Sequence, residues 1–301
     1  MSKYPRFPTK FRCRSLLHLS VLLLAACSAP PPSEFADFAK LGTALTDSTP
    51  PLLEAAFEEA LKTDTLVLST VRETLTDRQE RLDMLNISND DLKKRLEIYG
   101  DLTRHSQLLR SYFVTLGFLA DTSGDSALGA GAKGIVDQLQ GIHPKLAEAS
   151  FTDANVGEFL NAAVPVAVGA FRSVALKREL DARAETISSE LDLQQAVLSA
   201  IAQQMRADIE TRMEHENNIR IAQPFLDPGP LPGDWNERRL ASLRTPITLR
   251  AVDAAARASE NLRTSFIALS EGGGAGGSLA QLLQDVSTVV SLVEALKTPS
   301  P

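Results

Sequence analysis

An apolar stripe of unusual length runs through the second half of this chain and limits the folds open to it. It repeats every three or four residues and is apolar at seven of its ten positions: Leu180, Ala184, Ile187, Leu191, Gln194, Leu198, Ile201, Met205, Asp208 and Arg212. This spacing places all ten on one face of an α-helix. The predicted helix opens at Thr152-Asp153 and ends at Ala222, and Pro165 either kinks it or occupies the first turn of a second helix. From Pro165 onward it would be about 87 Å long, so it needs partner helices alongside it.

Helical spacing elsewhere predicts those partners. One stripe covers residues 57–85, with Pro50-Pro51 marking its start and residues 86–89 its end. A second helix is expected from Asn89 to Ala120, because Asn89 and the acidic residues after it suit a helix N-terminus. A brief helix is expected over residues 126–140, ended by His143-Pro144.

The last third of the chain predicts two more helices. Four prolines between residues 223 and 233 mark a break, after which a long helix begins near Asp234 with a kink at Pro246. Residues 271–277 form a glycine hinge before a final helix over 278–296. Alanine and leucine dominate, and we find no alternating β-branched run long enough for a strand. The predicted fold class is therefore all-α, an elongated antiparallel bundle of coiled-coil-like long helices over residues 34–301, with 121–165 as a candidate for a smaller cap.

The first 27 residues carry a targeting signal. A basic leader without acidic residues runs into the apolar stretch from Leu16 to Ala26, which stops at Leu24-Ala25-Ala26-Cys27. Eleven residues reach about 17 Å as a helix, too short for a hydrocarbon core of about 30 Å, which argues against a transmembrane anchor. The segment resembles the signal of a bacterial lipoprotein precursor. The resemblance implies that residues 1–26 are removed, that Cys27 is acylated, and that residues 27–33 form a Pro/Ser-rich tether. With a serine directly after the cysteine, the segment resembles those of lipoproteins sorted to the outer membrane. This resemblance implies a protein attached to the outer membrane and facing the periplasm.

The charge of the mature chain limits the partners it can bind, and its cysteine content limits the covalent and metal-binding sites it can form. Without residues 1–26 it carries 26 basic and 38 acidic side chains, a formal charge of −12. Such a surface repels phosphate backbones and anionic lipid head groups, so we expect no nucleic-acid partner and attachment to the membrane only through lipid on Cys27. Since Cys13 leaves with the signal and Cys27 takes the lipid, the domain has no disulfide and no thiolate site.

Familiar catalytic and cofactor motifs are missing or out of context. Two glycine-rich matches, at 129–134 and 272–277, follow no predicted strand, so a close helix contact and a linker explain them better than nucleotide binding. The residues three before His105, His143 and His215 are not glutamates, and Ile219 stands where a zinc-protease string needs its second histidine. No Gly-x-Ser-x-Gly elbow occurs. We therefore predict no catalytic, cofactor or metal residues and no enzyme, and we read each histidine as a solvated or capping side chain.

Two further segments leave alternatives open. Residues 159–171 are apolar except for Asn161, and a buried core helix is favoured over a membrane-inserting segment, because they are too short to span a bilayer. Six arginines make the last long helix basic, which fits either ion pairs inside the bundle, the favoured reading, or a docking strip for an acidic partner: Arg238, Arg239, Arg244, Arg250, Arg257 and Arg263.

Together these features predict a lipid-anchored helical protein of the cell envelope that acts as a non-catalytic binding or scaffolding module with an envelope protein as its partner. The alternative is a membrane-active bundle, similar in outline to helical pore-forming proteins, that releases 159–171 on contact. An exported enzyme comes third.

Overall fold

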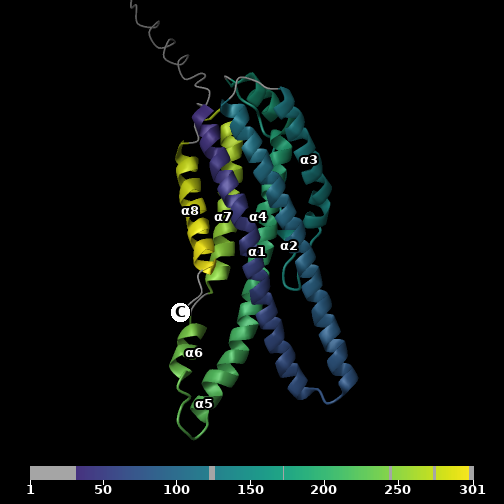
Figure 1. Ribbon diagram of the computed structural model, residues 1–301, viewed down its shortest axis with the longest axis vertical. Helices are drawn as coiled ribbons and strands as arrows, with labels where there is room; N and C mark the ends of the chain where they lie inside the picture. The colour runs from purple at the N-terminus through teal and green to yellow at the C-terminus, as the bar shows by residue number, and fades with distance from the viewer. Residues whose placement is uncertain (1–31, 122–125, 172, 244–245, 274–275, 298–301) are drawn as a thin grey trace, which may run out of the picture.

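The protein is described by a computed structural model that covers residues 32–121, 126–171, 173–243, 246–273 and 276–297. Over these residues the fold is an elongated antiparallel helical bundle, and the prediction of an all-α chain is confirmed (Figure 1). The same residues contain no β-strand, only one isolated bridge between Ser150 and Asn155. The six longest helices are α1 (Pro32–Thr74), α2 (Arg78–Asp121), α3 (Ser126–Ala147), α4 (Val174–Glu216), α7 (Ile247–Ser270) and α8 (Gly276–Lys297).

Helix α4 is the axis of the bundle. It packs against α7 on one side and α3 on another, and it also contacts α1 and α2. Helix α1 pairs along its length with α2, while α8 covers α7 and α1. The predicted stripe from Leu180 to Met205 is buried throughout, which confirms the reading of its spacing. Residues 121–165, a candidate for a smaller cap, include α3, which lies along α2 and α4 as part of the bundle.

Aromatic side chains fill the core at the end of the bundle where α1 begins. The ring of Phe38 lies 5.6 Å from that of Phe113 and 5.8 Å from that of Phe266, so one residue of α1 joins α2 to α7. Gly42 lets α1 and α2 approach closely here, because a Cβ atom at this position would lie 2.7 Å from the Phe113 ring. Packing of this kind holds a bundle without disulfides.

The predicted boundaries of the first two helices are wrong. Pro50 and Pro51 lie inside α1 rather than at its start, and the turn to α2 falls at residues 75–77 instead of 86–89. Asp77 caps α2 by accepting hydrogen bonds from the backbone N–H groups of Gln79 (2.6 Å) and Glu80 (3.0 Å). Asn89 lies in the interior of α2 and caps nothing.

Other prolines also differ from expectation. Pro144 lies within α3, which continues to Ala147 rather than ending before the proline. No long helix opens at Thr152, because residues 152–171 are largely non-helical apart from the single turn η1 (Val156–Glu158). Pro246 does not kink a helix but separates α6 (Trp235–Ser242) from α7. A π-helical turn, η2 (Asn217–Ala222), and α5 (Gln223–Leu226) follow α4 directly.

The last helix follows the prediction closely and has one further property. Within the described part of the chain, α8 is the single helix whose length and apolar composition match those of a membrane span. Core helices of soluble proteins pass the same test, and α8 buries four side chains against the bundle: Leu282, Val286, Val289 and Val293.

Candidate functional site

The lipid attachment predicted at Cys27, together with the signal peptide of residues 1–26, lies outside the described residues. The structure begins at Pro32, inside the predicted tether, with the first turn of α1. The candidate sites that the structure does describe lie on the bundle itself.

A buried polar cluster surrounds Glu190 in the middle of α4. Glu190 Oε2 lies 3.0 Å from Nε2 of His105 on α2, and Oε1 lies 3.1 Å from Nδ1 of His143 on α3. The side chains of His105 and Glu190 are almost fully buried, whereas His143 is about a third exposed. Because an ionised carboxylate only accepts hydrogen bonds, both ring nitrogens act as donors here. One carboxylate therefore ties three helices together.

The surroundings of this cluster shift the pKa values of His143 and Glu190. The hydrogen bond that His143 donates to Glu190 raises the pKa of His143 above its ordinary value, although burial acts in the opposite direction. Burial would raise the pKa of Glu190, but the hydrogen bonds from His105 and His143 outweigh it, and the pKa of the carboxyl is lowered. Both shifts favour an ionised Glu190 facing a protonated His143.

A second buried carboxylate, Asp192, holds the segment before α4 in place. It accepts hydrogen bonds from the backbone N–H (2.9 Å) and the side-chain amide (2.5 Å) of Asn161, and Arg263 of α7 lies 3.7 Å away. Residues 159–171, hereafter the strap, are attached a second time where the N–H of Gly169 donates to the carbonyl of Ser270 (2.8 Å). The strap thus runs along the bundle between two fixed points.

The strap corrects the prediction of a buried core helix. It is extended, Phe159, Val166 and Phe171 pack on the core only in part, and residues 161–165 are exposed. Within the described residues, the backbone of 162–168 makes no hydrogen bond to any other part of the chain. Valines at alternate positions 164, 166 and 168, with Pro165 between them, are the sequence signal that favours an extended segment.

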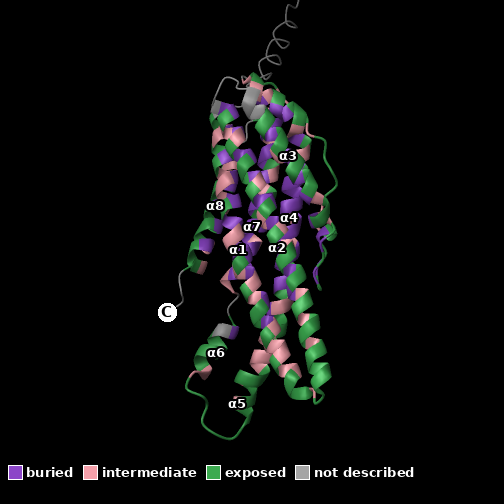
Figure 2. Ribbon diagram, turned by 45° about the vertical axis from the view of Figure 1, so that its right-hand side comes forward, coloured by how far each residue is buried: buried purple, intermediate pink, exposed green. Residues whose placement is uncertain are grey.

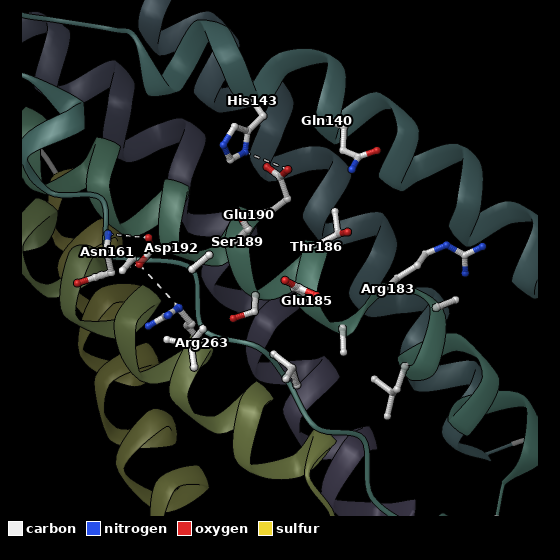
Figure 3. A pocket seen from close by; sticks show the side chains of 18 of the residues that line it. Gln140, His143, Asn161, Arg183, Glu185, Thr186, Ser189, Glu190, Asp192 and Arg263 are labelled. Carbon is white, nitrogen blue, oxygen red and sulfur yellow. Dashed lines mark hydrogen bonds and ion pairs between the residues drawn. The ribbon is translucent and has the colours of Figure 1, made fainter.

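A cleft of about 670 Å³ lies between the strap, α3 and the outward face of α4 (Figure 3). His143 and Gln140 stand at one side of it and Arg263 and Asp192 at the other, with Glu185, Thr186 and Ser189 of α4 between them. The Arg183 guanidinium binds the buried Glu179. Glu185 has no hydrogen-bond or ion-pair partner in the described part of the chain, so its carboxylate is available to a ligand.

The described residues that line the cleft include no candidate metal centre. Across the described residues, no group of three or more histidine, cysteine, aspartate or glutamate side chains is arranged to hold a metal ion. The reading of every histidine as solvated or capping is wrong for His105 and His143. The spacing in the sequence does indicate a buried position for His105, because it lies three residues after Leu102 and four before Leu109, on the buried stripe of α2.

Some arginines of the basic strip on the last long helices form ion pairs, as the favoured interpretation predicts, and others remain available to an acidic partner. Arg263 pairs with Asp192 inside the bundle, and Arg238 of α6 pairs with Asp234, the residue directly before that helix. Arg250 and Arg257 are exposed on α7 and have no ion-pair partner among the described residues, and Arg244 lies outside them. Pairing inside the bundle therefore accounts for part of the strip only.

A different surface lies at the end of the bundle farthest from Pro32. Two ion pairs mark its base, Arg212–Glu59 and Arg95–Asp208, each with a closest distance of 2.6 Å. Beyond them the molecule divides into two arms, the α1–α2 hairpin (residues 64–91) and the segment over 210–240 that includes η2, α5 and most of α6 (Figures 1 and 2).

Neither arm contains a buried residue among those described, although both carry large apolar side chains. The exposed ones are Leu82, Leu85, Ile87, Ile219, Phe225, Leu226, Leu231 and Leu240. Apolar surface concentrated in this way is a mark of an interaction site. The arms could not be predicted from the sequence, because a helical stripe looks the same whether or not the chain supplies a partner for it.

Comparison with known proteins adds no further guide. No protein-family model, no curated protein and no solved structure matches this chain.

Proposed function

We propose that this protein is a lipid-anchored, non-catalytic scaffold of the bacterial cell envelope that binds a protein partner through its two arms. The observation that carries the proposal is the pair of arms, because each exposes apolar helix surface that the described part of the chain leaves uncovered. A two-helix hairpin with no further partner buries little apolar surface and is only weakly stable. A bound helix would therefore stabilise both arms.

The position of the arms suits a tethered protein. Pro32 lies at the end of the bundle opposite the arms (Figure 1), and Cys27 precedes it by five residues in the sequence. Helix α1 has 43 residues, so the tip of the α1–α2 arm lies about 65 Å from Pro32. We propose an outer-membrane location facing the periplasm, supported by the residues around Cys27, with the acidic domain held by its acyl chains alone.

Site-specific crosslinking in intact cells tests the proposal. A photoreactive residue at Leu85 on one arm and at Leu240 on the other should each give a crosslinked protein product of discrete mass. The same residue at Thr288, exposed on α8, is the matched control and should give none. Absence of any protein product from both arms, or equal products from Thr288, would contradict a scaffold that works through the arms.

The strap favours one second candidate, a membrane-active protein. Its exposed apolar residues, Val164 among them, would meet lipid if the contacts at Asn161 and Gly169 opened. Against it stand those two hydrogen-bonded attachments and the lack of spanning length. Release of a dye from liposomes by the purified protein separates this candidate from the scaffold.

A further inference from the structure

The cleft beneath the strap has the features of a site for an extended polypeptide. Its volume of about 670 Å³ falls within the range of ligand pockets. One wall is the strap, an extended apolar segment, and the opposite wall is a polar helix face. These two walls offer different contacts, and each can be matched to a property of the ligand.

The strap offers main-chain hydrogen bonds. Residues 162–168 make none with the rest of the described chain, yet the segment is kept extended by its attachments at Asn161 and Gly169. An extended backbone with unpaired N–H and C=O groups is a template on which another chain adds as a β-strand. Pro165 removes one donor, which an edge strand tolerates.

The helix wall sets the charge of the ligand. Four carboxylates line the cleft, and three of them already have partners: Asp181 with Lys177, Glu190 with the two histidines, and Asp192 with Asn161 and Arg263. Arg183 is likewise taken by Glu179. Glu185 alone of the four has no partner among the described residues, and Thr186 and Ser189 of the same helix also line the cleft. A cationic side chain complements it.

We infer that this cleft binds an extended segment of a partner polypeptide, which pairs with residues 162–168 through its backbone and places a lysine or arginine against Glu185. Alternate side chains of such a segment point to opposite sides, so apolar residues beside the cation would contact the valines of the strap. The site is separate from the arms, and the inference stands whether or not the arms bind the partner proposed above.

Selection from a library of random linear dodecapeptides, displayed on phage, tests the inference with the purified protein as the target. Wild-type protein should enrich sequences in which lysine or arginine alternates with valine, isoleucine or leucine. Ser189→Trp places a large side chain on the exposed floor of the cleft and should abolish enrichment. Ser291→Trp, an equal change on the exposed face of α8, should retain it.

An enriched peptide is then synthesised and its binding measured by fluorescence anisotropy. Methylation of its alternate backbone nitrogens should abolish binding, and Glu185→Gln should weaken it about two- to fivefold, while Glu97→Gln on the exposed surface of α2 leaves it unchanged. No enrichment on the wild-type protein, equal enrichment on Ser189→Trp, selection of acidic peptides, or binding that survives backbone methylation would each overturn the inference.

Discussion

Replacement of Glu190 by glutamine should destabilise the whole bundle. The change keeps the volume of the side chain but removes its charge and one of its two acceptor oxygens. His105 is fully buried, and its other ring nitrogen, Nδ1, has no hydrogen-bond partner among the described residues. The variant therefore leaves an imidazole poorly satisfied inside the core. Hydrogen bonds to charged groups contribute about 1.5–3 kcal/mol each, and breaking a buried pair costs about 3–5 kcal/mol. We expect the free energy of unfolding to fall by about 2–4 kcal/mol.

Urea denaturation monitored by circular dichroism measures this loss in the free energy of unfolding. Glu185→Gln is the matched control, because it removes an exposed, unpaired carboxylate from the same helix and should change the free energy by less than about 0.5 kcal/mol. The double variant His105→Leu/Glu190→Leu replaces the buried pair by apolar side chains and should be more stable than Glu190→Gln. A Glu190→Gln protein as stable as wild type would refute the account of the cluster.

The same cluster predicts a pH dependence on both sides of neutrality. The pKa of Glu190 is lowered in the folded protein, so its stabilisation is present above the ordinary value of 4.5 and is lost as the pH falls through the lowered one. The pKa of His143 is raised, so its stabilisation is complete below the ordinary value of 6.5 and is lost as the pH rises through the raised one. Glu190→Gln should remove the loss on the alkaline side, as urea melts at a series of pH values would reveal.

Three further predictions follow from single positions. Gly42→Ala should cost about 1–3 kcal/mol in thermal melts because the new methyl group meets the Phe113 ring, whereas Gly100→Ala, with open space around it, should gain about 0.5–1 kcal/mol. Cys27→Ser should abolish incorporation of a labelled fatty acid, and label that persists in this variant would disprove the anchor. Val166→Asp should lower stability by less than about 2 kcal/mol, since the side chain is only half-buried. If wild-type protein releases dye from liposomes and Val166→Asp does not, the membrane-active candidate replaces the scaffold.

The sequence predicts the class of fold well because helical spacing is repeated over many turns, and a repeated signal survives local exceptions. Single prolines are such exceptions. Pro50 and Pro51 would end an isolated helix, but Leu52 and Leu53 beside them are buried against the rest of the bundle, and that packing outweighs the lost backbone hydrogen bonds. The turn at residues 75–77 carried a readable cap, since Asp77 is followed three residues later by Glu80.

The candidate sites were harder to predict because they depend on contacts between distant parts of the chain. His105 and Glu190 are 85 residues apart, and Asn161 and Asp192 are 31 apart. Nothing in the local pattern around either carboxylate distinguishes it from a solvated residue on a helix. The apolar run of 159–171 was ambiguous for a different reason, since continuous apolar residues have no period from which helix and extended chain can be told apart.

The placement of Glu190 and Asp192 on α4 explains why buried charge is useful in this bundle. Side chains two residues apart on a helix are related by a rotation of about 200° around its axis, so the two carboxylates point to nearly opposite sides of α4. Glu190 fixes α2 and α3, while Asp192 fixes the strap and α7. A stripe that repeats every seven residues would bury almost as much apolar surface if α4 slid by one repeat, and only the polar partners distinguish the two alignments. Replacing His105, His143 and Glu190 together by leucine should therefore leave the helix content unchanged but broaden the thermal transition and the amide resonances. A triple variant with sharp melting and well-dispersed resonances would mean that apolar packing alone sets the alignment of α4.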